Sequence, residues 1–174
     1  MYFLEAEEVK KIPQESLPLL VLSDNLRSFI SWGIKAHQHG DYNHLMWMHR
    51  PGFVVTQGWT LREDPIEKYL PTHRLKFWTG QYWSPQNRRQ VCRALYRAAR
   101  QPWYKRVYDP LQILGKFLNI PWIQLPGLNI CSDHADILSM LQVWERGRHL
   151  SPPEVNRRMI EIPTNVVYGR YVPD

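Results

Sequence analysis

Two runs of apolar and aromatic residues on either side of Pro51-Gly52 constrain the fold of this chain most strongly. The first run covers residues 42–48 and the second covers residues 53–59. A Pro-Gly pair between two such runs is typical of the turn of a β-hairpin. The sequence therefore predicts two antiparallel strands joined by a short turn.

The length of the hairpin loop decides which side chains share a face. With a loop of residues 49–52, His44 lies opposite Gln57, and a tighter turn at the Pro-Gly pair leaves both on one face because the side-chain period is two. Only a three-residue loop would turn Gln57 away and bring Thr56 or Gly58 to that face. We therefore predict that the hairpin presents the imidazole of His44 next to the amide of Gln57.

Residues 128–138 place a cysteine where a helix is expected to begin. Pro126 and Gly127 break whatever precedes it, Asn129 is a good N-cap, and apolar residues then recur at helical spacing. Unpaired backbone N–H groups and the helix dipole favour a thiolate at such a terminus. Cys131 is therefore a candidate nucleophile, and the alternative is a small apolar residue buried in the core.

Length and composition fit one domain of residues 1–174 with a core over about 19–171. The two cysteines, Cys92 and Cys131, provide no disulfide framework, which favours a reducing compartment. The N-terminus lacks the pattern of a signal peptide, and no apolar run reaches the length of a membrane span. We expect synthesis in the cytoplasm, with delivery by a phage particle or by lysis if the protein acts outside it.

The basic character of the chain points to an anionic partner. The formal charge is +6 and the pI is about 9.4, which suits nucleic acid, an anionic lipid surface or a cell-wall polymer. Residues 86–106 contain seven cations and no acid, mostly on a helix predicted over 85–100. Such a run is usually a solvated face, and the alternative is a docking surface for an anionic polymer. The arginines assigned to that surface are Arg88, Arg89, Arg93 and Arg97.

Shorter patterns predict the remaining elements. Residues 17–22 and 74–78 have the composition of strands, and residues 64–69 fit either a short helix or an irregular excursion. Further predicted elements are a helix over 26–35, a helix over 109–118, a helix start at Ser151-Pro152-Pro153-Glu154, and an edge strand over 165–171.

Three of these residues together would supply the parts of a cysteine hydrolase. Cys131 would be the nucleophile, and His44 would be the base and then the acid to the leaving group. Gln57 would hydrogen-bond the far nitrogen of the imidazole and fix its tautomer. The backbone N–H of Cys131 would supply one oxyanion donor. The sequence separation of His44 and Cys131 neither supports nor opposes their meeting.

The order of these motifs resembles a known family. The motifs are residues 42–47, a second strand ending in a polar residue, Tyr108-Asp109 opening a helix, Cys131-Ser132-Asp133 followed by an apolar helix, and residues 151–154. This order is similar to the circularly permuted branch of the NlpC-type papain-like cysteine hydrolases, which includes YiiX-like proteins and lecithin–retinol acyltransferase. In that branch the histidine strand precedes the cysteine helix. The resemblance covers about residues 19–154.

The resemblance implies an α+β fold in which a small antiparallel sheet packs against helices in a permuted papain-like topology. It also implies hydrolysis or transfer of an acyl group through a thioester. Cys131 matches the nucleophile, His44 the base and Gln57 the polar orienter, a position at which the family often has histidine or glutamate. Asp133 stands where glutamate is usual, and its charge opposes the thiolate unless it caps the helix.

The resemblance extends to a class of substrate. Members of the superfamily cut peptide bonds in peptidoglycan, other amides, or lipid esters, and the basic face and eight tryptophans favour a peptide or cell-wall polymer. We assign Tyr42, Trp59 and Trp122 to substrate binding, and we expect no cofactor.

Three other interpretations stay open. The four histidines over 37–49 suggest a metal site, but they lack the helical pair of a zinc protease, so we expect no metal. A nucleic-acid-binding module would use the cations of residues 88–106 with Trp103 and Tyr104, although no nucleic-acid-binding motif is present. An inactive papain-like domain kept for binding is the third, and the presence of both Cys131 and His44 argues against it.

Overall fold

The structure is a computed structural model that describes residues 2–27, 40–58, 60–81, 83–107 and 151–173. The helices predicted over most of 26–35, over 109–118 and after Cys131 lie outside the described residues.

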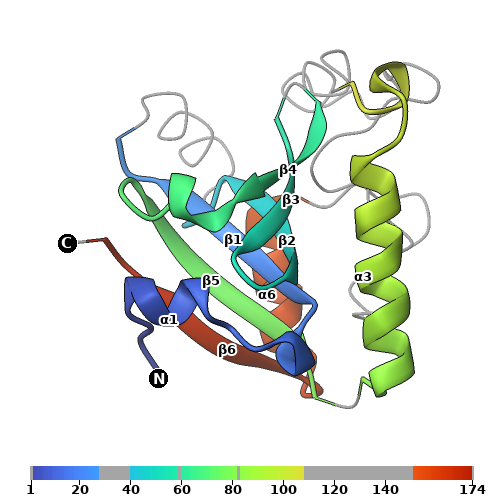
Figure 1. Ribbon diagram of the computed structural model, residues 1–174. Helices are drawn as coiled ribbons and strands as arrows, with labels where there is room; N and C mark the ends of the chain where they lie inside the picture. Colours follow the sequence, from blue (N-terminus) through green and yellow to red (C-terminus); the bar gives the residue numbers. More distant parts are fainter. Residues whose placement is uncertain (1, 28–39, 59, 82, 108–150, 174) are drawn as a thin grey trace.

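Six antiparallel strands form one sheet in the order β4-β3-β2-β1-β5-β6 (Figure 1). Their bounds are Leu19–Asn25 (β1), His44–Arg50 (β2), Phe53–Gln57 (β3), Leu61–Pro65 (β4), His73–Gly80 (β5) and Asn165–Tyr171 (β6). The strands predicted over 17–22, 74–78 and 165–171 are confirmed within a few residues. Residues 64–69, which fitted a helix or an excursion, hold the end of β4 and the 3-10 helix η2 (Ile66–Lys68). The prediction of an antiparallel sheet packed against helices is thus confirmed at this level.

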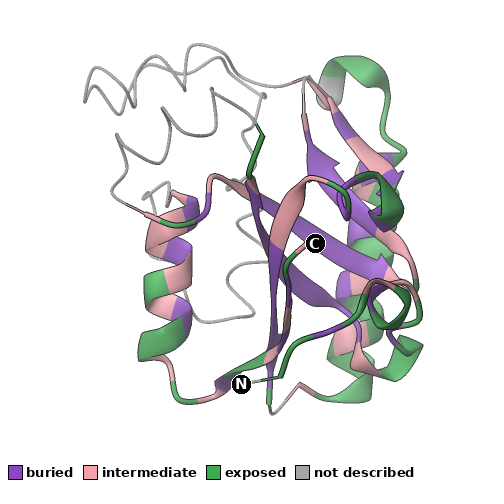
Figure 2. Cartoon of the chain, turned by 90° about the vertical axis from the view of Figure 1, so that its left-hand side faces the viewer, coloured by how far each residue is buried: buried purple, intermediate pink, exposed green. Residues whose placement is uncertain are grey.

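Each face of the sheet carries its own apolar cluster. The helix-covered face, which carries Leu22 and Trp47, packs against α3 (Pro85–Ala99) and α6 (Pro152–Glu161). The N-terminal face, which carries Val21 and Met46, packs against the segment that includes α1 (Ala6–Lys10) and against η2. Figure 1 shows α6 and α1 on opposite sides of the sheet, and in Figure 2 the buried residues concentrate on the strands between them. Because β1 is covered on both faces, its first six residues are all buried.

Local hydrogen bonds explain where the two long helices begin. The Ser84 side chain caps α3 by accepting from the backbone N–H of Asn87 at 3.1 Å, and proline follows in the first turn. A capping box between Ser151 and Glu154 opens α6. Both helix starts are therefore confirmed as predicted. The remaining 3-10 turns are η1 (Gln14–Ser16) and η3 (Trp103–Lys105).

The hairpin forms, but the predicted register is wrong. The turn is the tight one: Arg50 pairs with Phe53, and Gly52 adopts the positive φ of 73° that favours glycine. A β-bulge between Met48 and Arg50 then shifts the pairing by one residue, so that Met46 lies opposite Thr56. One extra residue exchanges the two faces of the strand. As a result His44 shares its face with Thr56, and Gln57 lies on the other face. This arrangement was expected only for a three-residue loop.

Candidate functional site

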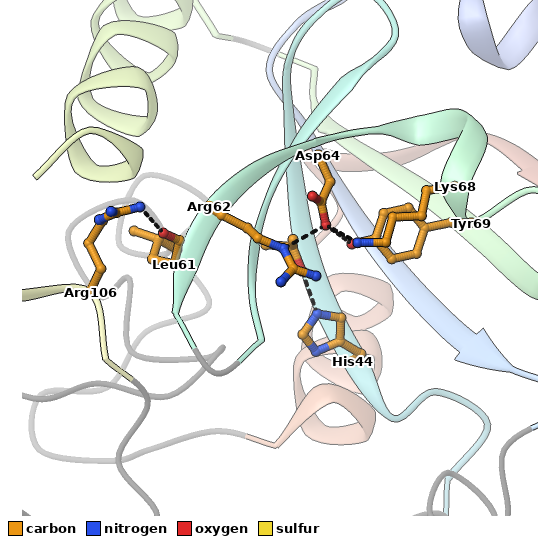
Figure 3. A network of polar contacts seen from close by, with 8 residues as sticks. His44, Leu61, Arg62, Asp64, Lys68, Tyr69 and Arg106 are labelled. Atoms are coloured by element: carbon orange, nitrogen blue, oxygen red, sulfur yellow. Dashed lines mark hydrogen bonds and ion pairs between the residues drawn. The ribbon is translucent and has the colours of Figure 1, made fainter. Parts of the chain in front are cut away.

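The imidazole of His44 lies at the first position of β2, on the N-terminal face. Its Nε2 is 2.7 Å from the hydroxyl oxygen of Thr56 on β3 (Figure 3). Burial, with smaller contributions from the nearby His73 and Arg62, lowers the pKa of His44 to about 4. The ring is therefore neutral at physiological pH, so that one of its nitrogens is free to accept a proton.

A cluster of hydrogen bonds surrounds a carboxylate on β4, the strand next to Thr56. The phenol of Tyr69 donates to Asp64 Oδ2 at 2.8 Å. Arg62 and Lys68 donate to the same Asp64 oxygen at 2.9 and 3.0 Å (Figure 3). Although burial raises the pKa of Asp64, these hydrogen bonds and charges lower it below its ordinary value. Asp64 is therefore an ionised acceptor that holds Arg62, Lys68 and Tyr69 together.

Nε2 of His44 and the hydroxyl of Thr56 share one hydrogen bond, in which either group can donate depending on the tautomer of the ring. With Thr56 as the acceptor, the ring proton resides on Nε2 and Nδ1 carries the lone pair.

The prediction that Gln57 orients His44 is wrong. The Gln57 side chain is buried on the helix-covered face, where its amide donates to the carbonyl of Arg106 at 3.0 Å. The Arg106 guanidinium in turn donates to the carbonyls of Leu61 and Ala99. Gln57 therefore connects β3 to the segment that follows η3. Thr56 lies beside the imidazole, at the place predicted for Gln57.

A second imidazole, that of His73, accompanies His44, although no sequence pattern indicated it. His73 is the first residue of β5, and its ring packs edge-on against Tyr69 with 5.1 Å between centroids. Its Nδ1 lies 2.8 Å from the hydroxyl of Thr72. Burial lowers the pKa of His73, so it too is neutral at physiological pH. Only the strand order β2-β1-β5 brings the two histidines to one end of the sheet, and no local pattern indicates that order.

One of the four arginines assigned to the polymer-docking surface points inward. The guanidinium of Arg88 donates to the carbonyls of Ser16 and Gly80 at 2.9 and 3.1 Å and to the hydroxyl of Thr79 at 3.2 Å. The prediction that Arg88 contacts an anionic polymer is therefore wrong, because its donors are used to attach α3 to η1 and β5. The other three, Arg89, Arg93 and Arg97, are exposed as predicted.

Of the remaining predicted site residues, the structure describes only Tyr42. Cys131, Trp59 and Trp122 lie outside the described residues. Tyr42 is buried on the helix-covered face, where the Arg74 guanidinium lies 5.4 Å from the centre of its ring. The structure thus does not place Tyr42 beside the imidazole, which lies on the other face.

Within the described residues, no group of three or more histidine, cysteine or acidic side chains is arranged to hold a metal ion. No helix in the same part of the chain is both long and apolar enough to cross a bilayer. Comparisons of this chain with protein families, with characterised proteins and with solved structures gave no match.

Proposed function

We propose that the protein is a cysteine hydrolase that cleaves an amide or peptide bond through a thioester, with Cys131 as nucleophile and His44 as base. The observation that carries the proposal is the state of His44: a neutral imidazole that is held at Nε2 by the hydroxyl of Thr56. In the proposal the ring proton resides on Nε2, so that Nδ1 can take a proton. A thiol–imidazole pair requires a base in this state.

In the proposed reaction, Nδ1 of His44 accepts the proton of the Cys131 thiol as the sulfur attacks the carbonyl carbon of the substrate. The resulting imidazolium returns this proton to the leaving amine, and the C–N bond breaks to give a thioester. Water, deprotonated by the same ring, then hydrolyses the thioester. The hydroxyl of Thr56 holds the ring at Nε2 while the other nitrogen takes and returns the proton.

Thiol alkylation tests this proposal, because Cys92 provides an internal standard. Burial raises the pKa of Cys92 to about 11, so almost none of it is thiolate at pH 7. We expect iodoacetamide to label Cys131 at least on the order of a hundredfold faster than Cys92 in the native protein. The rates are measured by mass spectrometry of the two cysteine-containing peptides.

Unfolding the protein in urea is the control, because the two thiols should then react at similar rates. A native Cys131 that reacts no faster than glutathione at the same pH would contradict an activated nucleophile and with it the proposed reaction.

A non-enzymatic module that binds an anionic polymer is the second candidate function. Arg89, Arg93 and Arg97 recur every four residues on α3, which spaces them about 6 Å apart along one side of the helix. All three are exposed, and none forms an ion pair with another described residue. Beyond the helix, Trp103 and Tyr104 are 69% and 56% exposed, so they are free to stack on a ligand.

Replacing Arg89, Arg93 and Arg97 together by glutamine is expected to weaken binding to a single-stranded oligothymidylate probe. The slope of log K against log salt should become shallower by about 2, because three phosphate contacts are lost. Fluorescence anisotropy titrations at several salt concentrations measure both quantities. The melting temperature should stay unchanged, since these side chains are exposed.

Arg88→Gln is the matched control on the same helix. It should leave the salt slope unchanged and lower the free energy of unfolding by about 1–3 kcal/mol, because buried acceptors lose a charged donor. Two results together would favour this second function over the first. The protein would show no hydrolytic activity, and its tight binding to the oligonucleotide would be unchanged in Cys131→Ala. An unchanged salt slope in the triple variant would exclude this surface.

A further inference from the structure

A pocket of about 370 Å³ opens on the helix-covered face, next to strands β5 and β6 and helix α6. We call it the cationic pocket, because its wall contains Arg74, Lys76 and Arg170. Asp41 is the one acidic residue in its lining. Its size lies in the range of pockets that bind small molecules. The pocket is separate from the site around His44, whose ring lies on the other face of the sheet.

Two of the three cations face each other directly. Lys76 on β5 and Arg170 on β6 are Cα partners in the register of the two strands. Like charges directly opposite on neighbouring strands destabilise a sheet. Neither side chain forms an ion pair with a described residue, whereas Arg74 contacts Asp24 at 3.2 Å. The pair therefore has no ion-pair partner within the described part of the protein, and the charge of Asp41 in the same lining opposes the lowering of the Lys76 pKa only in part.

The environment of Lys76 adds to this imbalance. The residue is only 3% exposed, and its ammonium donates to the neutral amide oxygen of Asn156 at 2.9 Å. The same nitrogen lies 4.3 Å from the centre of the Trp78 ring. Burial, followed by the charge of Arg170, lowers the pKa of Lys76 to about 8. A buried ammonium with neutral partners gains most from an anion placed beside it.

The rim of the pocket has a different character. Phe3, Ile160 and Val172 line it and are 58%, 62% and 47% exposed. Exposed apolar side chains around a charged interior match a ligand that has both an anionic group and an apolar group.

We propose that the cationic pocket binds a small organic oxyanion, a carboxylate or a phosphate monoester. Its charged group lies between Lys76 and Arg170, and its apolar part contacts the rim formed by Phe3, Ile160 and Val172. The site supplies two positive donors to the anion and apolar contact to the remainder of the ligand.

Isothermal titration calorimetry with phenyl phosphate, benzoate and inorganic phosphate tests this proposal at pH 7. We expect saturable binding of phenyl phosphate or benzoate at least tenfold tighter than that of inorganic phosphate. The tighter of the two organic anions identifies the charged group that the pocket prefers. Lys76→Met and Arg170→Met should each weaken this binding at least tenfold. Raising the pH from 7 to 9 should also weaken it, because Lys76, whose pKa is about 8, loses its proton.

Lys11→Met is the matched control, since it makes the same chemical change at a lysine that is 77% exposed. It should leave the affinity within twofold. Absence of saturable binding for both organic anions, or equal affinities in the wild type and both pocket variants, would overturn the proposal. So would inorganic phosphate binding as tightly as the organic anions, because the apolar rim would then contribute nothing. None of these outcomes depends on Cys131, so failure here is distinguishable from failure of the proposed hydrolase.

Discussion

Replacing Cys131 by alanine or His44 by glutamine is expected to lower amide hydrolysis by about a thousandfold or more. Cys131 would form the thioester, and His44 would carry the proton in both halves of the reaction. Because the two act as one unit, the double variant should be hardly worse than either single variant. The release of new amino groups from purified cell walls measures this activity.

Cys92→Ser is the control for loss of a thiol as such, and it should keep full activity. The pH dependence gives a second check on His44. The ring acts as a base only when neutral, and its pKa is about 4. The acid limb caused by His44 should therefore lie near pH 4, below the value of an ordinary histidine. A His44→Gln enzyme that keeps more than a tenth of the activity would exclude His44 as the base and direct attention to His73.

Replacing Thr56 by valine is expected to lower kcat by about 10- to 100-fold and to change KM by less than twofold. Valine has nearly the same shape but leaves Nε2 of His44 without its hydrogen-bond partner at 2.7 Å. The tautomer with the proton on Nδ1, which cannot act as base from that nitrogen, then becomes populated. Steady-state kinetics on a soluble peptide substrate would separate kcat from KM.

Thr56→Ser is the matched control, because it keeps the hydroxyl and should keep kcat within about threefold. Gln57→Leu should also leave kcat nearly unchanged, since its amide points away from the imidazole toward Arg106. If Gln57→Leu lowered kcat more than Thr56→Val, the hydrogen bond with Thr56 would not be what orients the ring.

The hairpin shows which features of the fold a local sequence pattern predicts and which it does not. The Pro51-Gly52 turn was predictable, because a proline followed by a glycine of positive φ meets the needs of a tight turn. The bulge that reverses the faces was not. It allows two consecutive residues, His49 and Arg50, to lie 2.8 Å from the same carboxylate, that of Glu63 on β4. A regular strand would point them to opposite faces, so a contact with a later strand selects the register.

The sequence by itself determined where the helices α3 and α6 begin and, within a few residues, where the strands β1, β5 and β6 lie. The Ser84 cap and the Ser151–Glu154 capping box join residues three positions apart, so they are readable along the chain. The tertiary structure alone decided which side chains meet. The order of the strands brings His73 toward His44 and sets Lys76 against Arg170, and packing of α3 turns Arg88 inward. These outcomes depend on contacts between segments that are distant in the sequence, and a local pattern does not predict the free energies of such contacts.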